Sequence, residues 1–294
     1  MKILVVGSNG QVGNCLKDEA SSFGFSVVGY DLPEIDITSL ESVKSVFEKE
    51  KPELLINAAA FTAVDKAEEE VELSYLVNDK GTENLAIACN SSGIPFFHIS
   101  TDYVFDGEEG MYMEDSPVNP QSVYGASKLA GEISAKNYCT KTLILRTSWV
   151  FSSYGNNFLK TMVKLARTRD ELGIVSDQKG APTSARDIAK ALLLFATEFK
   201  AGKDIFGTYH FTGSPYATWY DFAKQIFQDA ETAKLIDKQP KVNAIKTSEY
   251  PLPAKRPMDS RLDCSKIFNN LDNIKNDWRP EVARIVQKLQ EEGF

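Results

Sequence analysis

Two observations predict an α/β fold for this 294-residue chain. Short apolar segments rich in β-branched residues alternate with longer segments of helical character, the order expected of a parallel sheet with crossover helices. The first apolar run, residues 2–6 (KILVV), shows no polar alternation and leads directly into a glycine-rich turn, as expected for a strand covered on both faces. We therefore predict a doubly wound parallel sheet of the Rossmann type, followed by a smaller C-terminal α/β domain that binds the substrate.

The predicted boundary between the two domains lies near residue 151. Residues 1–151 are expected to form the dinucleotide-binding domain and residues 152–294 mainly the substrate-binding domain. The helix near residues 184–200 is expected to pack back on the first domain.

Composition and charge argue against several classes of protein. Hydrophobic residues make up 43% and charged residues 25%, ordinary values for a soluble globular protein. A formal net charge of −8 without a basic run argues against a nucleic-acid partner. Cys15, Cys89, Cys139 and Cys264 show no C-x-x-C spacing, which argues against a zinc site and fits a reducing cytoplasm. We recognise neither a signal peptide nor a membrane span.

The glycine-rich turn is the first candidate binding element. Gly7, Gly10 and Gly13 give the pattern G-x-x-G-x-x-G, and a helical stretch over residues 11–23 follows. Missing side chains let the backbone approach a pyrophosphate at a helix N-terminus. A plain turn with glycines chosen for positive φ is the alternative, but the flanking strand and helix favour nucleotide binding.

The second strand, residues 25–30, ends at an acid. Asp31 stands where a dinucleotide fold places the carboxylate that binds the adenosine ribose, which favours NAD. No Arg or Lys lies between Asp31 and Val43 to meet a 2′-phosphate, although this does not exclude NADP. Asp36 is expected to cap the helix over residues 39–50, to approach the adenine, or both.

The third strand, residues 54–57, is followed by small side chains. The alanines at positions 58–60 let a flat cofactor pass close to the backbone, although packing alone also explains them. We expect Ala60, Phe61 and Thr62 to contact the cofactor because ligands collect at the carboxyl ends of strands in open α/β sheets. A long helical segment over residues 66–92 comes next.

The fourth strand, residues 94–100, ends with a hydroxyl. Thr101 is expected to lie over the nicotinamide and to hydrogen-bond the substrate oxygen, although a threonine at a strand end also commonly satisfies a backbone group. His98 lies within the strand and is predicted to be a hydrogen-bonded core residue rather than a catalyst.

The following helix carries Tyr124 and Lys128, four residues apart. This spacing puts both side chains on one helical face, and Pro120 is expected in the first turn. A tyrosine titrates near ~10, so it needs a neighbouring cation to work in acid-base catalysis at neutral pH. The pair also occurs by chance on solvated helices. The order of motifs along the chain favours the catalytic interpretation.

The second half of the chain continues the alternation. We predict strands over residues 142–146, 172–175 and 209–211, helices over 158–169, 185–199 and 218–229, and a loop over 178–183. The aromatic residues Trp219, Tyr220 and Phe222 are expected in the core. The proline-rich residues 250–262 carry three candidate cations for a substrate diphosphate, Lys255, Arg256 and Arg261, with a solvated loop as the competing interpretation.

Taken in order, these motifs resemble those of the extended short-chain dehydrogenases. A narrower set resembles the dTDP-4-dehydrorhamnose reductases and covers nearly the whole chain. These segments are STDYVFDG (100–107), VYGASKLAGE (123–132), RTSWVF (146–151), GNNF (155–158), DQKGAPT (177–183) and RP…SRL (256–262).

The resemblance implies reduction of the C4 ketone of dTDP-4-dehydro-L-rhamnose by NADH or NADPH. Tyr124 would donate the proton, Lys128 would lower the tyrosine pKa and bind the ribose, and Thr101 would tune the carbonyl oxygen. The expected substrate contacts are Thr101, Asp102, Trp149 and Arg256. The expected cofactor contacts are Gly7, Gly10, Gln11, Val12, Gly13, Asp31, Asp36, Ile37, Ala60, Phe61, Thr62, Ile99, Tyr124 and Lys128, with core packing an equally good explanation for Val12 and Ile99.

The resemblance also bears on metal use, assembly and alternative functions. Some family members are associated with magnesium at a subunit contact through an acid early in the first helix, and Cys15 stands there in this chain. A homodimer is the family-level expectation. An epimerase or dehydratase of nucleotide sugars remains an alternative, although Asp102 is followed by Tyr103 rather than a second acid. A non-catalytic relative, such as the regulatory subunit of methionine adenosyltransferase, is another.

Overall fold

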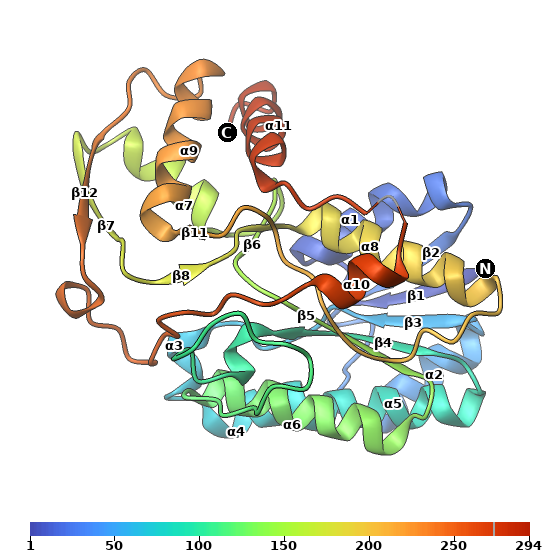
Figure 1. Cartoon of the computed structure of the whole chain (residues 1–294). Helices are drawn as coiled ribbons and strands as arrows, with labels where there is room; N and C mark the ends of the chain where they lie inside the picture. The colour runs from blue at the N-terminus through green and yellow to red at the C-terminus, as the bar shows by residue number, and fades with distance from the viewer. Residues whose placement is uncertain (273) are drawn as a thin grey trace.

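A six-stranded, entirely parallel sheet forms the centre of the computed structural model, which describes residues 1–272 and 274–294 (Figure 1). Its strands are β1 (Lys2–Val6), β2 (Ser26–Tyr30), β3 (Leu54–Asn57), β4 (Phe96–Thr101), β5 (Thr142–Thr147) and β10 (Gly207–His210). Their order across the sheet is β10-β5-β4-β3-β1-β2. The predicted doubly wound parallel sheet is confirmed.

The strand order creates a crevice at one edge of the sheet. After β1 the chain passes to β2 on one side and then returns to β3 on the other. Loops that leave neighbouring strands in opposite directions open a gap at the carboxyl ends of those strands. The loops after β1 to β5 all reach this edge, so the sheet itself assembles the candidate site.

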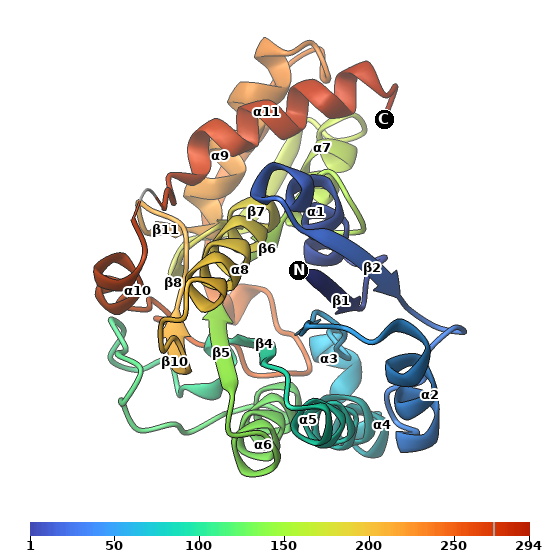
Figure 2. The ribbon, with the colours of Figure 1, turned by 90° about the vertical axis from the view of Figure 1, so that its right-hand side faces the viewer.

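Helices cover both faces of the sheet (Figure 2). On one face α1 (Gln11–Glu19) packs with α8 (Ala185–Lys200) and α10 (Ser265–Asn270) over a shared apolar core. The other face is covered by α2 (Leu40–Glu50), α5 (Gly81–Ser92) and α6 (Val123–Tyr138). Three later segments therefore return to the first lobe, namely α8, the edge strand β10 and α10.

A second, smaller lobe has its own apolar core. Its helices are α7 (Phe158–Ala166), α9 (Trp219–Thr232) and α11 (Trp278–Glu291), and its main strands β7 (Glu171–Val175) and β12 (Lys241–Ile245) pair in parallel. Short pairs connect the lobes, namely β6 (Val150–Phe151) with β9 (Thr183–Ser184) and β8 (Lys179–Gly180) with β11 (Ala217–Thr218). The second lobe thus contains the predicted helices α7 and α9 and the predicted strand β7, whereas β12 and α11 were not predicted.

Two predicted helices differ from those observed. The segment over residues 66–92 is not one helix but α3 (Val64–Ala67), α4 (Val71–Tyr75), a π-helical turn η2 (Leu76–Lys80) and α5. Asn78 in η2 turns its amide inward to the loop after β3, a use of π-helical turns that is common near functional sites. Pro120 does not begin α6, because Ser122 is the N-cap and accepts a hydrogen bond from the Gly125 amide at 3.1 Å.

The described residues also contain three 3₁₀ turns: η1 (Ala20–Phe23), η3 (Asp102–Val104) and η4 (Thr247–Glu249). The four cysteines are buried and free. Within residues 1–272 and 274–294, no helix combines the length and the apolar character needed to cross a membrane.

Candidate active site

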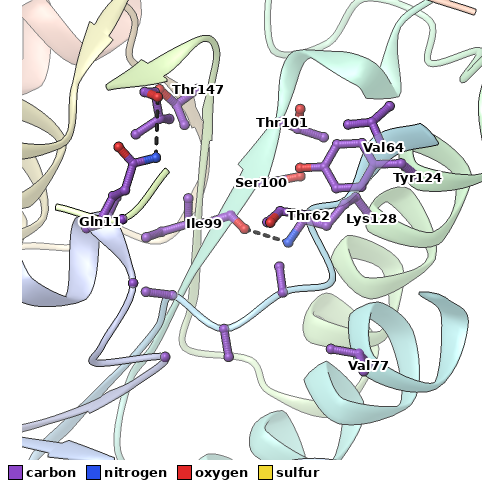
Figure 3. Close-up of a pocket in the computed structure, with 18 of the residues that line it drawn as sticks. Gln11, Thr62, Val64, Val77, Ile99, Ser100, Thr101, Tyr124, Lys128 and Thr147 are labelled. Atoms are coloured by element: carbon purple, nitrogen blue, oxygen red, sulfur yellow. Dashed lines mark hydrogen bonds between the residues drawn. The ribbon is translucent and has the colours of Figure 1, made fainter. Parts of the chain in front are cut away.

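A cavity of about 1040 Å³ opens at the carboxyl edge of the sheet. The loops after β1, β2, β3, β4 and β5 line it from the first lobe, and residues 155–158 close it from the second. Figure 3 shows the Tyr124, Lys128 and Thr101 side chains on one wall and Gln11 on the opposite wall. Polar groups at strand ends therefore converge on one space large enough for a dinucleotide.

The turn after β1 is shaped for close approach of a ligand. Gly7 has φ +77°, and a Cβ there would collide with the backbone of Ala59, so only glycine suits this position. Gly10 is the N-cap of α1 and supplies no capping side chain, which leaves amides of the first helical turn available to an anion. Gly13 was predicted to contact the cofactor, but it does not line the cavity. It instead lets α1 pack against the carbonyl of Gly7.

The acids after β2 have distinct places. Asp31 lines the cavity, and its carboxylate accepts hydrogen bonds from the amides of Asn9 at 3.1 Å and Leu32 at 3.0 Å. Asp36 also lines the cavity, but it accepts from the amide and hydroxyl of Thr38. The predicted capping role of Asp36 is wrong, because Ser39 is the N-cap of α2.

The loop after β3 is held by a buried amide. Ala60 and Thr62 line the cavity, whereas Phe61 does not. The Phe61 amide donates to Asn78 Oδ1 at 2.8 Å and its carbonyl accepts from Asn78 Nδ2 at 3.1 Å. The prediction for Phe61 is therefore corrected: its backbone anchors the loop, and its neighbours form the wall.

The catalytic candidates meet where α6 crosses the end of β4. A Cβ at Gly125 would collide with the carbonyl of Tyr103, so this glycine lets α6 approach η3 closely. Tyr124 consequently lies beside Thr101. Lys128 is only 2% exposed, and its Nζ donates to the carbonyl of Ile99 at 2.8 Å. The structure brings Tyr124, Lys128 and Thr101 together as predicted. Ile99 lines the cavity and also supplies the carbonyl that accepts from Lys128.

Burial dominates the acid-base properties of this trio. It raises the pKa of Tyr124 to about 12, although the Thr101 hydroxyl opposes the shift. Burial also lowers the pKa of Lys128 to about 8, although the charge of Glu132 opposes that shift. Burial therefore sets the direction of the net shift of the Tyr124 pKa, and the lowering expected from Lys128 does not reverse it. Tyr124 is a protonated phenol at neutral pH, ready to act as an acid rather than a base.

Thr101 has two protein partners. Its hydroxyl donates to Asp102 Oδ1 at 3.0 Å and accepts from the amide of Tyr103 at 3.2 Å. Thr101 therefore does satisfy a backbone group, the alternative that the sequence left open.

Three buried polar atoms of residues that line the cavity have no hydrogen-bond partner among the described residues: Ser100 Oγ, Asp102 Oδ2 and Thr147 Oγ1. Buried polar groups are normally paired, so these atoms mark where a polar ligand would bind. Burial raises the pKa of Asp102 to about 6.

Two tryptophans form the border with a second cavity. The indoles of Trp149 and Trp219 stack with ring centroids 3.7 Å apart. Trp149 has φ +46°, an unusual conformation for a non-glycine residue, and Gly180 leaves room for its ring. Trp219 packs against the apolar core of the second lobe, as predicted, but it is only partly buried and also lines both cavities. Trp219 is the first residue of α9, and the spacing of apolar residues there does not distinguish a side chain in the core from one that lines a cavity.

The second cavity, of about 680 Å³, shares Asp102, Tyr103, Trp149, Phe158 and Trp219 with the first and extends under residues 250–260. Arg256 lines it, but its guanidinium pairs with both carboxylate oxygens of Asp65, at 2.8 and 2.6 Å. Arg261 pairs with Asp259. Of the three predicted cations, Lys255 and Arg256 line this cavity and Arg261 does not, and Arg256 is already held by a partner that the sequence did not reveal.

The sequence analysis also missed the role of residues that connect the lobes. Gln11 Oε1 accepts from Ser152 Oγ and from Asn157 Nδ2, both at 2.9 Å. The glycine-rich turn is thus tied to the second lobe beside the cavity. The GNNF segment contained a signal for this contact, because its second asparagine, Asn157, is the N-cap of α7.

Metal ligands are not gathered in the part of the chain that the structure describes, which contains no group of three or more His, Cys, Asp or Glu placed to hold an ion. Cys15 is buried, and burial and the charge of Asp18 raise the pKa of its thiol to about 12. A neutral thiol is a poor ligand for magnesium.

Comparisons with known proteins agree with this geometry. The family model described as the RmlD substrate binding domain matches residues 1–291. A dTDP-4-dehydrorhamnose reductase of Aggregatibacter actinomycetemcomitans is 44% identical, covering 97% of this chain and 98% of that protein. The crystal structure of a dTDP-4-dehydrorhamnose reductase from Clostridium acetobutylicum is 41% identical with a TM-score of 0.90, covering 99% of this chain and 100% of that one.

A third relative was solved with a ligand. The dTDP-4-dehydrorhamnose reductase of Bacillus anthracis, in complex with NADP, is 33% identical with a TM-score of 0.88 and covers 98% of this chain and 99% of that one. The fold, the trio at the cavity wall and the full-length similarity lead to one conclusion. The chain belongs to the family of dTDP-4-dehydrorhamnose reductases.

Proposed function

We propose that this protein reduces the C4 ketone of dTDP-4-dehydro-L-rhamnose to dTDP-L-rhamnose with a reduced nicotinamide cofactor. The observation that supports this most is the position of Tyr124, a partly buried protonated phenol that lies beside Thr101 and lines the first cavity. Relatives of the same length are named for this reaction.

The first cavity fits a nicotinamide dinucleotide. The Cβ-free turn at Gly7 and the open amides of α1 suit the pyrophosphate, and Asp31 lies at the adenosine end. The unpaired hydroxyls of Ser100 and Thr147 lie at the other end, where a nicotinamide amide would meet them. In this assignment Lys128 binds the nicotinamide ribose.

The bound cofactor supplies the hydride that reduces C4. Tyr124 donates its phenolic proton to the C4 oxygen, and Thr101 holds that oxygen in line. Loss of the proton leaves a phenolate in a buried site, which is costly unless a cation lies close by. The Lys128 ammonium, one helical turn away, is the cation that stabilises it.

The second cavity is assigned to the nucleotide sugar. Asp102 Oδ2 is available to a sugar hydroxyl, and the Trp149 indole provides an apolar wall. Arg256 carries positive charge to the same space while Asp65 fixes its orientation. We assign residues 152–294 mainly to substrate binding, with α8 and β10 serving the first lobe.

We further propose that NADH is preferred and that the enzyme is a cytoplasmic homodimer. The preference rests on the Asp31 carboxylate, which would repel a 2′-phosphate. NADP bound to the Bacillus anthracis relative gives the competing expectation. Sedimentation velocity tests the dimer. Activity after chelation of divalent ions tests magnesium, for which Cys15 offers no carboxylate.

The function is tested by mixing the purified protein with dTDP-4-dehydrorhamnose and either NADH or NADPH, following the loss of reduced-nicotinamide absorbance. Oxidation that yields dTDP-L-rhamnose supports the proposal, and the ratio of the two rates tests Asp31. Cofactor binding without oxidation would favour another sugar or a regulatory relative. Tightly retained NAD with epimerised product would favour an epimerase.

A further inference from the structure

Three buried polar side chains form a line beneath the site, and the proposed reaction uses only the last. Asn57 ends β3, His98 lies beside it on β4, and Lys128 lies above both on α6, with exposed fractions of 1%, 0% and 2%. The parallel register pairs Asn57 directly with His98, so the fold fixes this contact. At such burial, each hydrogen must find an acceptor.

The Asn57 amide sets the orientation of the line. Its Oδ1 accepts a hydrogen bond from the backbone amide of Ala59 at 3.0 Å. An amide nitrogen in that place would put two N–H groups against each other, so Nδ2 must be the atom that faces His98. The distance from Nδ2 to His98 Nδ1 is 3.1 Å. Since Nδ2 only donates, His98 Nδ1 must present its lone pair.

The hydrogen of a neutral imidazole then lies on Nε2. This atom is 3.3 Å from Lys128 Nζ, which also donates to the Ile99 carbonyl at 2.8 Å. An ammonium has three hydrogens and no lone pair, whereas a neutral amine has a lone pair that accepts the Nε2 hydrogen. We infer that His98 is a positioning residue that, through its Nε2 hydrogen, favours the neutral amine of Lys128 over the ammonium.

The surrounding charges are compatible with this inference. Burial and the positive charge of Lys128 keep the pKa of His98 well below its ordinary value, so the imidazole stays neutral. Glu132, one turn further along α6, favours the ammonium, but its carboxylate is already held by Arg146 of β5 at 2.8 and 2.7 Å.

The other groups that face this line add little charge. Tyr124, one turn earlier on α6, is an uncharged phenol at neutral pH. The helices packed against α6 present the neutral Ser74 and Asn78, which bind Ser127. Asp102 in η3 is the remaining acid near Tyr124.

The consequence concerns how Lys128 titrates. On the proposed function, Lys128 must be an ammonium to stabilise the phenolate, and His98 lowers its affinity for that proton. His98 thereby sets the alkaline end of the pH range in which reduction is fast. A purely structural histidine would leave this limit unchanged.

The test is NMR on the full chain without cofactor or substrate, with ¹⁵N-labelled histidine and ¹³C,¹⁵N-labelled lysine. The wild-type protein should show a hydrogen on His98 Nε2 and none on Nδ1, and Lys128→Met identifies the lysine signal. A hydrogen on Nδ1 would overturn the inference. Because catalysis is not measured, the result is independent of whether the proposed reaction is correct.

A variant reverses the hydrogen arrangement. In Asn57→Asp one carboxylate oxygen still accepts from Ala59 and the other accepts from His98 Nδ1, which moves the imidazole hydrogen and turns Nε2 into an acceptor for the ammonium. The Lys128 pKa should rise by on the order of one pH unit or more. His98→Phe and the double variant measure the effect of the new charge alone, so the rise should be larger with His98 present. Equal rises in both backgrounds would overturn the inference, and the wild-type spectrum decides it should these variants fail to fold.

Discussion

Gly180→Ala is predicted to disturb the tryptophan border without touching the cofactor turn. A Cβ at position 180 would lie 2.5 Å from Cε2 and 2.9 Å from Nε1 of Trp149. Carbon atoms prefer separations of about 3.5–4.0 Å, so the indole must move by roughly 1 Å. It has little freedom to do so, because Trp219 stacks on it at 3.7 Å and its own backbone has φ +46°.

The size of the effect follows from these constraints. Overpacking of this kind costs about 1–3 kcal/mol, so the free energy of unfolding should fall by that amount. If the indole leaves the wall of the second cavity, where we propose that it contacts the sugar nucleotide, each ~1.4 kcal/mol of lost binding raises KM tenfold. We expect KM for the sugar nucleotide to rise about tenfold, with a much smaller change in cofactor Kd.

The assay combines urea unfolding with initial rates at varied sugar nucleotide, and cofactor titration by fluorescence. Gly173→Ala is the matched control for crowding of the second cavity, since Gly173 also lines that cavity but a Cβ there meets only Ile245 side-chain atoms at 3.3 Å or more and not Trp149. Unchanged stability and unchanged KM in Gly180→Ala would refute the reasoning that this glycine makes room for a rigid wall.

Three further predictions concern charge. Glu132→Gln leaves the buried Arg146 guanidinium without its carboxylate, so the free energy of unfolding measured in urea should fall by about 3–5 kcal/mol; a loss below ~1 kcal/mol would contradict this. Asp31→Ala should raise the ratio of kcat/KM for NADPH to that for NADH, and an unchanged ratio would show that Asp31 does not select the cofactor. Burial lowers the pKa of Lys128 to about 8, and its ammonium is lost above that pKa, so kcat for reduction should fall as pH rises through about 8; a rate that rises over this range would show the opposite protonation requirement.

Much of the first lobe could be predicted because its signals are local. The glycines follow the run at residues 2–6 directly, and the acid at position 31 directly follows the next strand. The spacing of Tyr124 and Lys128 likewise fixed their shared helical face. Each of these inferences needed only the geometry of one strand, one turn or one helix.

The misses arose where distant segments meet. Asp65 and Arg256 are 191 residues apart, so no local pattern joins them. Trp219 lines the cavity together with Trp149, on which it stacks, and the two lie far apart in the sequence. The pKa of Tyr124 depends on its burial at the cavity wall, which helical spacing does not reveal. Asn78 holds the Phe61 loop only because a π-helical turn points its amide inward.

The central claim is that Tyr124 supplies the proton in ketone reduction, and Tyr124→Phe tests it most directly. The ring keeps its packing against Tyr103, and only the hydroxyl is lost. With dTDP-4-dehydrorhamnose and NADPH or NADH, kcat should fall by at least ~100-fold, the contribution of a positioned general acid, while cofactor Kd stays within about twofold. Oxidation of the cofactor at a rate near that of the wild-type protein would contradict the account.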